Sequence, residues 1–345
     1  MSTWTLQQLG WNSFFQQQLS LPEYETLRPV RVVEQYRDRL AVAGDRLELD
    51  LPLFNSMPGM TVGDWLLLDS EDRFQRLLER KSLFSRKAAG TRVKEQLIAA
   101  NVDTAFLVSS LNQDFNLNRI ERYLALVHEA GAEPVVVLTK VDLVADPDTP
   151  VQQVRALDPM LFVESLNATD PDAVDSLRDW CPGGSTAVFL GSSGVGKSTL
   201  ANSLLGENLQ ATGDIREDDG KGRHTTTRRS LLPIPGGGLL LDTPGMRELQ
   251  LADVDEGLGK TFADIVDIAR DCRFTDCQHA SEPGCAVLAA LEAGRLDARR
   301  LNNYRKLLRE QALNSATLAE KRSRDKAQGK LYKRVLAQSQ GHKKR

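Results

Sequence analysis

The chain has 345 residues, of which 41% are hydrophobic and 26% are charged. Such a composition is typical of a folded globular protein, and the length suffices for two or three domains with hydrophobic cores. The sequence lacks the apolar run of about 18 residues that a membrane helix requires, and its N-terminus lacks the basic and apolar segments of a signal peptide. We therefore expect a cytoplasmic protein that does not enter a membrane.

The net charge of −3 hides an uneven distribution along the chain. Residues 321–345 carry ten Lys or Arg and a single acid, whereas the first 320 residues carry 34 Lys or Arg and 46 Asp or Glu. A basic tail of this kind commonly binds nucleic acid, because each neutralised phosphate releases counterions. A solvated tail with no partner is the alternative.

The first third of the sequence indicates an extension followed by a small β-domain. Residues 1–28 are rich in Gln and contain scattered aromatic residues. Strand-like runs then alternate with turn signals, and the candidate strands are Val30–Val33, Leu40–Ala43, Arg46–Leu49 and Trp65–Leu68. Four or more short strands within about 60 residues favour a small closed barrel, with an OB-fold as the leading option.

From about residue 93 the pattern changes to apolar strands that alternate with amphipathic helices such as Leu117–Glu129. The apolar runs are Thr104–Val108, Pro134–Leu138, Leu161–Val163, Thr186–Leu190 and Leu239–Leu241. Continuous apolar strands between helices predict a parallel sheet that is covered on both faces. After residue 255 the sequence becomes mainly helical.

A phosphate-binding loop follows the run Thr186–Leu190. Its sequence fits GxxxxGK followed by Ser or Thr, and Thr199–Leu205 continues as a helix, which is the context that this motif requires. Backbone N–H groups of such a loop surround phosphate oxygens, the lysine reaches the outer phosphates and the next hydroxyl binds Mg²⁺. The predicted phosphate-binding residues are Gly191, Ser192, Ser193, Gly194, Val195, Gly196, Lys197, Ser198 and Thr199.

Downstream, the sequence Asp-Thr-Pro-Gly at 242–245 follows an apolar strand. We expect Asp242 to orient Mg²⁺ through water and the backbone N–H of Gly245 to donate to the terminal phosphate. The alternative is an ordinary strand-to-turn sequence without a ligand.

The segment Thr139, Lys140, Val141 and Asp142 is the best match to the guanine-reading signature NKxD, and it lies about 50 residues before the phosphate loop rather than after it. The Asp142 carboxylate can accept from N1–H and N2–H₂ of guanine, a donor pair that adenine lacks. Lys140 would lay its aliphatic stem across the purine. Thr139 replaces the usual Asn, so its brace to neighbouring loops is expected to be shorter or missing. The backbone of Ser165 is a candidate partner for guanine O6.

A glycine-rich stretch with three threonines lies between the loop and Asp242. Thr227, or as a second choice Thr226, is expected to bind Mg²⁺ when the γ-phosphate is present. Met246 occupies the position at which many GTPases carry the Gln that orients the attacking water. His224 is the nearest candidate to replace it, although a lone histidine is more often a surface residue. The predicted catalytic residues are Lys197, His224 and Thr227.

Three of the four cysteines cluster with a histidine within 14 residues. The set Cys272, Cys277, His279 and Cys285 suits a closed tetrahedral Zn²⁺ site, which would be structural because it leaves no position for a catalytic water. Coincidental thiols are the alternative.

In this order, these motifs resemble the ribosome small-subunit-dependent GTPase A (RsgA) family of circularly permuted GTPases. The resemblance runs from about Val30 to about Glu310 and includes the sequence SRKAAG at 85–90, the sequence LNQDFNL at 111–117, the phosphate loop, the sequence GRHTTT at 222–227 and the Cys/His set. The family's histidine at the position of His224 is its proposed catalytic residue. Thr139 and the Gln-rich N-terminus depart from the family pattern.

The resemblance implies a multi-domain protein. The expected parts are an N-terminal extension (1–28), an OB-fold RNA-binding domain (29–92), a circularly permuted α/β GTPase domain (93–255), a mainly α zinc-binding domain (256–320) and a basic tail (321–345). The implied function is late assembly of the small ribosomal subunit by a monomer that binds the subunit and its rRNA. The subunit would stimulate GTP hydrolysis, and the implied ligands are GTP or GDP, Mg²⁺ and one structural Zn²⁺.

Two other functions are compatible with parts of the sequence. A GTP-sensing regulator that binds another RNA would share the barrel and the basic tail. A P-loop kinase is disfavoured by the combination of the guanine-reading segment with Asp242 and its turn.

Overall fold

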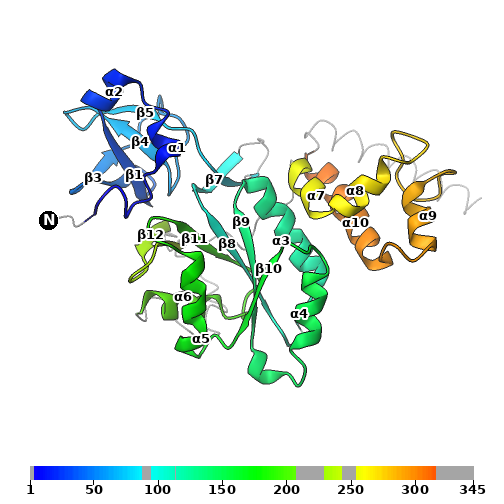
Figure 1. Cartoon of the computed structure of the whole chain (residues 1–345). Helices are drawn as coiled ribbons and strands as arrows, with labels where there is room; N and C mark the ends of the chain where they lie inside the picture. Colours follow the sequence, from blue (N-terminus) through cyan, green and yellow to red (C-terminus); the bar gives the residue numbers. More distant parts are fainter. Residues whose placement is uncertain (1–3, 88–94, 113, 207–228, 243–253, 316–345) are drawn as a thin grey trace, which may run out of the picture.

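A computed structural model describes residues 4–87, 95–112, 114–206, 229–242 and 254–315. It has an N-terminal β-domain, a central α/β domain and a C-terminal helical region (Figure 1). Within these ranges, no helix is long and apolar enough to cross a membrane. Several predicted features lie outside the described residues: His224, Thr226, Thr227, Gly245, Met246 and the basic tail.

The N-terminal β-domain is an antiparallel arrangement of five strands in the order β3-β2-β1-β4-β5. The strands are β1 (Arg28–Gln35), β2 (Arg39–Gly44), β3 (Leu47–Pro52), β4 (Trp65–Leu68) and β5 (Phe74–Leu77). The first, second and fourth contain the strands predicted from the sequence, whereas β3 begins one residue later than predicted and continues to Pro52. Val30, Val32, Leu66 and Leu68 belong to one core cluster that forms the interior of this domain.

The N-terminal extension covers the outer face of β4. It contains α1 (Ser13–Gln16) and α2 (Leu21–Thr26). The rings of Trp11 and Phe15 lie 4.9 and 5.6 Å from that of Trp65, and Leu67 belongs to the same cluster. Burial on both faces explains why β4 is apolar at all four positions instead of alternating.

The central sheet has the strand order β10-β9-β8-β11-β13-β12. Its strands are β8 (Thr104–Ser110), β9 (Glu133–Thr139), β10 (Phe162–Leu166), β11 (Thr186–Leu190), β12 (Arg229–Pro233) and β13 (Leu239–Asp242). The first five in this order are parallel, as predicted, but β12 runs antiparallel to β13. The five apolar runs named from the sequence are therefore parallel, and β12 is an additional antiparallel strand that was not predicted from the sequence. The turn between Ile234 and Gly238 is too short for a crossover, so it joins antiparallel neighbours.

Helices cover both faces of this sheet (Figure 1). On one face lie α3 (Leu117–Ala130) and α4 (Asp148–Arg155); on the other lie α5 (Pro171–Asp175), the 3₁₀ helix Ser176–Trp180 and α6 (Lys197–Leu205). Leu107 packs in the cluster that contains the α3 side chains, whereas Phe106 and Val108 pack in the cluster that contains α6. Both faces are therefore buried, which accounts for the continuous apolar runs.

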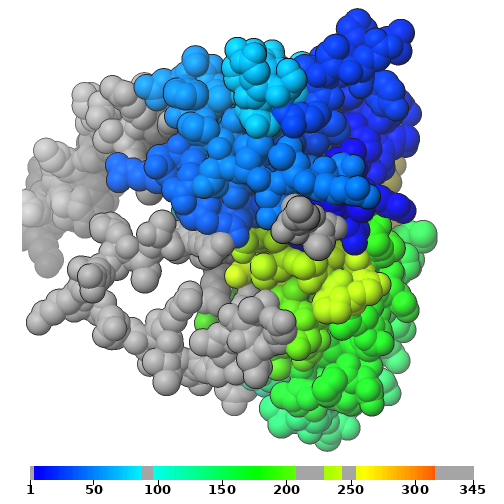
Figure 2. Space-filling model, turned by 90° about the vertical axis from the view of Figure 1, so that its left-hand side faces the viewer, coloured from blue at the N-terminus to red at the C-terminus, as the bar shows by residue number. Residues whose placement is uncertain are grey.

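The N-terminal β-domain continues the central sheet. The end of β1 pairs with the start of β12, with Gln35 opposite Arg229. Figure 2 shows the N-terminal residues in blue directly on the yellow-green segment that contains β12. A separate hairpin of β6 (Leu83–Lys87) and β7 (Glu95–Ala100) spans residue 92, where the sequence placed a domain boundary.

The C-terminal region consists of α7 (Asp255–Thr261), α8 (Ala263–Ala269), α9 (Ala286–Glu292) and α10 (Ala298–Ser315). It lies against α3, to the right in Figure 1. Helix α7 approaches α3 so closely that a Cβ on Gly257 would lie 2.0 Å from the carbonyl oxygen of Ala125. Glycine is therefore required at this crossing.

Candidate nucleotide site and metal centre

The phosphate loop follows β11, which lies in the middle of the central sheet between β8 and β13. Ligands of open α/β sheets bind beyond the carboxyl ends of such strands. Gly191 begins the loop with a φ of 144°, and a Cβ there would lie 2.2 Å from the carbonyl oxygen of Val108. The first glycine of the motif is therefore needed for both its conformation and its packing.

The loop leads directly into α6, whose first residue is Lys197. The Lys197 ammonium donates to the carbonyl oxygen of Gly191 at 2.8 Å and to that of Ser192. It therefore lies within the curve of the loop. Ser198 and Thr199 follow in the first helical turn, where unpaired N–H groups favour an anion.

The guanine-reading segment, residues 139–142, precedes the phosphate loop in the chain but is hydrogen-bonded to it. The buried hydroxyl of Thr139, at the end of β9, donates to the carbonyl oxygen of Val195 at 2.7 Å. The Lys140 ammonium donates to the carbonyl oxygen of Gly194 at 2.8 Å. Of the two expectations for Thr139, a shorter brace or a missing one, the second is excluded, because the threonine hydroxyl reaches the loop.

Asp142 lies just beyond, in the 3₁₀ helix Val141–Leu143, with an exposed side chain. Lys140 has a φ of 61°, and this left-handed residue turns the chain from β9 into the 3₁₀ helix. Asp142 thus follows, two residues on, the lysine that contacts the phosphate loop, and it is exposed.

The loop after β10 also reaches the phosphate loop. Ser165 lies within β10, paired with Leu138. Ala168 lies farther on, 3.5 Å from the position of a Cβ on Gly196. Asn167 accepts from the N–H of Thr169 at 3.0 Å, and the sequence Asn-Ala-Thr after a strand could have indicated this turn.

Asp242 ends β13, beside β11, and is partly buried. The register of these parallel strands puts it level with the end of β11, where the phosphate loop begins. The predicted magnesium ligands Ser198 and Asp242 therefore follow neighbouring strands at the same edge of the sheet. The third, Thr227, lies outside the described residues.

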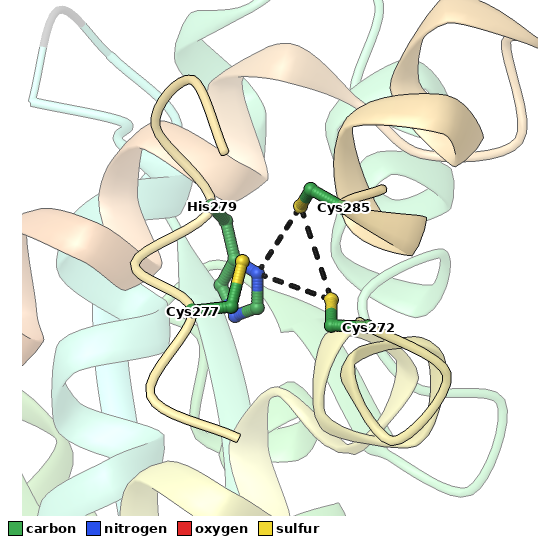
Figure 3. Close-up of side chains that lie close together, drawn as sticks. All are labelled: Cys272, Cys277, His279 and Cys285. Atoms are coloured by element: carbon green, nitrogen blue, oxygen red, sulfur yellow. Dashed lines mark hydrogen bonds between the residues drawn. The ribbon is translucent and has the colours of Figure 1, made fainter. Parts of the chain in front are cut away.

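The four predicted metal ligands come together in the C-terminal region (Figure 3). Their ligand atoms lie within 4.8 Å of one another. The Nδ1 atom of His279 is 3.6 Å from the Sγ atom of Cys272 and 3.5 Å from that of Cys285, and these two sulfurs are 3.9 Å apart. A tetrahedral zinc site has ligand atoms about 3.5 to 3.8 Å apart, so the cluster fits Zn²⁺.

The surrounding loop orients these ligands. Cys285 caps α9, and its sulfur accepts from the N–H of Leu288 at 3.4 Å. The Glu282 carboxylate accepts from the N–H groups of Ser281 and Ala280, which lower its pKa to about 2. Burial lowers the pKa of His279 and so favours the neutral imidazole that binds metals.

Comparisons with known proteins agree with this architecture. Residues 77–252 match the model of a family described as RsgA GTPase. The chain is 57% identical over 332 residues to the small ribosomal subunit biogenesis GTPase RsgA 2 of Vibrio parahaemolyticus, covering 96% of this chain and 93% of that relative. It is 48% identical over 317 residues to the small ribosomal subunit biogenesis GTPase RsgA of Mesorhizobium japonicum, with coverages of 90% and 91%.

Two solved structures share the fold. The crystal structure of YjeQ from Thermotoga maritima has a TM-score of 0.62 and 27% identity, and the match covers 82% of this chain and 98% of that one. YloQ, described as a circularly permuted GTPase, has a TM-score of 0.60 and 25% identity, with coverages of 82% and 94%. This chain therefore belongs to the RsgA GTPase family and is a GTP-hydrolysing enzyme on a circularly permuted GTPase fold.

Proposed function

We propose that this GTPase acts in the assembly of the small ribosomal subunit, binding the subunit through its rRNA as a monomer in the cytoplasm. The observation that carries the proposal is the match to relatives named for small-subunit biogenesis, which extends over 96% of the chain and so includes all three parts of the molecule. The ten basic residues of the tail supply charge that suits an rRNA partner.

The phosphates of GTP bind at residues 191–199 in this proposal. Lys197 shifts its ammonium from the loop carbonyls that it contacts to the outer phosphates, and α6 contributes its N–H groups. Mg²⁺ supplies charge neutralisation between the outer phosphates when bound, and the residues that would hold it are Ser198, Thr227 and, through water, Asp242. Gly245 donates its N–H to the terminal phosphate.

The Asp142 carboxylate selects guanine by accepting hydrogen bonds from N1–H and N2–H₂ of the base. The Lys140 stem covers one face of the base, and the loop at Asn167 and Ala168, which lies against the phosphate loop, is the better candidate than Ser165 for guanine O6. The hydrogen bonds of Thr139 and Lys140 to the phosphate loop keep the base-reading and phosphate-binding segments in one fixed relation.

For hydrolysis we assign His224 as the residue that orients the attacking water. Met246 carries no group that can accept a hydrogen bond from water strongly, and His224 lies in the same threonine-rich segment as Thr227. If this is correct, His224→Ala retains GTP affinity and loses subunit-stimulated turnover. Unchanged stimulation would exclude the assignment.

Zn²⁺ is proposed as the resident ion of the four-ligand cluster, where it would pin the loop between α8 and α9. Elemental analysis of the purified chain should give one zinc per molecule, and Cys285→Ser should lower that ratio. A full zinc complement in Cys285→Ser, or none in the wild-type chain, would contradict the proposal.

The assembly role is tested by GTP turnover of the full chain alone, with purified small subunits and with purified large subunits. We expect small subunits to raise turnover more than about tenfold, a change of about 1.4 kcal/mol in the barrier. Large subunits and the Lys197→Ala variant serve as controls and should show no stimulation. Equal turnover in all three conditions would point instead to a GTP sensor that acts on another RNA.

A further inference from the structure

Helix α3 contacts two different parts of the molecule through its opposite faces. Successive residues of an α-helix are about 100° apart, so residues two positions apart point in nearly opposite directions. Arg119 contacts the phosphate loop through Ser192. Glu121, two positions farther along the helix, contacts α10.

On the first face, the Arg119 side chain forms a hydrogen bond with Ser192, the second residue of the phosphate loop. Its Nη1 atom donates to the Ser192 hydroxyl at 2.8 Å and to the Asp114 carboxylate at 2.5 Å. Burial raises the pKa of Tyr123, one turn farther along the helix. Ser192 thus directs its carbonyl toward Lys197 and its hydroxyl toward α3.

On the opposite face, α3 is fixed by a fully buried carboxylate. Glu121 accepts from Arg299 at 2.8 and 3.0 Å, from Arg300 at 2.8 Å and from Asn303 at 2.6 Å. The Glu129 carboxylate accepts from the N–H of Gly257 at 2.8 Å. The backbone that carries Arg119 is therefore held on a rigid element.

We propose that Arg119 is a positioning residue for the GTPase reaction, which acts by holding the Ser192 hydroxyl and so fixing the first bend of the phosphate loop. A charged donor on a rigid helix, oriented by its own carboxylate partner, can impose one geometry on the loop. The motif requires only the backbone at position 192, so this contact is a property of the side chains of this chain. Arg119 touches the loop and acts on the phosphates only through it.

Affinity measurements on the full chain test this inference. Arg119→Ala and Ser192→Ala should each weaken binding of both GDP and GTP by about tenfold, the effect of losing one hydrogen bond to a charged group. The double variant should be no weaker than either single variant, because both changes remove the same contact. Ser192→Thr keeps the hydroxyl and should bind both nucleotides as the wild type does.

Arg122→Ala is the matched control. Arg122 pairs with Glu310 of α10 at 2.7 Å rather than with the phosphate loop, so its removal should leave nucleotide affinity unchanged. Additive losses in the double variant, or wild-type affinity in Arg119→Ala, would overturn the proposal. So would a lower kcat in Arg119→Ala with unchanged affinities, because Arg119 would then act on the reacting phosphate rather than on the loop.

Discussion

The two parts that flank the GTPase domain are attached to it by different chemistry. On the N-terminal side the contacts are mainly with the backbone: β1 pairs with β12, and buried Arg31 joins the carbonyl oxygens of Leu9 and Gly63, within the N-terminal part, to that of Asn101. On the C-terminal side, the α3–α10 contact is dominated by side-chain charges that converge on Glu121.

This difference indicates how strongly each junction should be weakened when a side-chain charge is removed. Backbone pairing makes the β-domain an extension of the sheet, and Arg229 of β12 strengthens it by donating to Oε1 of Gln35 in β1 at 3.2 Å. The charge cluster between α3 and α10 converges on one carboxylate and should weaken most when that charge is removed.

The largest effect is expected for Glu121→Gln. It leaves Arg299 and Arg300 without their shared buried anion, which should cost about 3 kcal/mol of unfolding free energy. Denaturant unfolding of the full chain measures this loss. Glu310→Gln is the control, because its pair with Arg122 is partly exposed and should contribute less than about 1 kcal/mol. Equal effects of the two substitutions would show that Glu121 is not the dominant charge of the α3–α10 contact.

A smaller loss of unfolding free energy is expected for Arg31→Met. Three carbonyl oxygens lose a donor, but the cost of burying a cation, which lowers the Arg31 pKa to about 10, disappears as well. We expect a net loss of about 1 to 2 kcal/mol in denaturant unfolding. Arg28→Met removes a half-exposed pair with Asp72 and serves as the control, with a change below about 1 kcal/mol. A loss as large as that of Glu121→Gln would show that both junctions depend equally on single charges.

The smallest effect is expected for the pH dependence of the unfolding free energy, to which His128 at the C-terminal junction contributes. His128 of α3 lies 3.0 Å from the Thr261 hydroxyl of α7, and burial together with Lys260 lowers its pKa below the ordinary value. The unfolded chain therefore binds the proton more tightly than the folded chain. The stability contributed by neutral His128 is present above about pH 6.5 and is lost as the pH falls through the folded pKa.

Unfolding free energies between pH 8 and pH 5 measure this loss. His128→Asn cannot titrate, so its stability should fall less steeply over that range than that of the wild type. Because burial also lowers the pKa of His279, the difference between the two chains isolates the contribution of His128. Identical slopes would show that His128 does not contribute.

Much of the fold could be predicted because its signals are local. The apolar run Thr186–Leu190, the glycine motif and the helix after it follow directly from short-range pattern, and the structure has β11 with the same bounds. The four metal ligands were predictable for the same reason, since they lie within 14 residues.

The features that could not be predicted from the sequence depend on distances between segments far apart in the chain. Whether the Thr139 hydroxyl reaches Val195 is decided by how closely β9 and β11 pack around β8, not by either motif. The aromatic residues of the N-terminal extension gave no indication that Trp65 was their partner. Arg119 resembles any charged residue of an amphipathic helix until the phosphate loop is placed beside it.

The central claim is that Asp142 and the phosphate loop form one guanine-nucleotide site in spite of their reversed order in the chain. Titration of the full chain and of Asp142→Asn with GDP, ADP and xanthosine diphosphate tests it most directly. The wild type should bind GDP and reject ADP, whereas Asp142→Asn should lose GDP and gain xanthosine diphosphate, because an amide can donate to the additional carbonyl of xanthine. Equal binding of ADP and GDP by the wild type, or unchanged base preference in Asp142→Asn, would contradict the account.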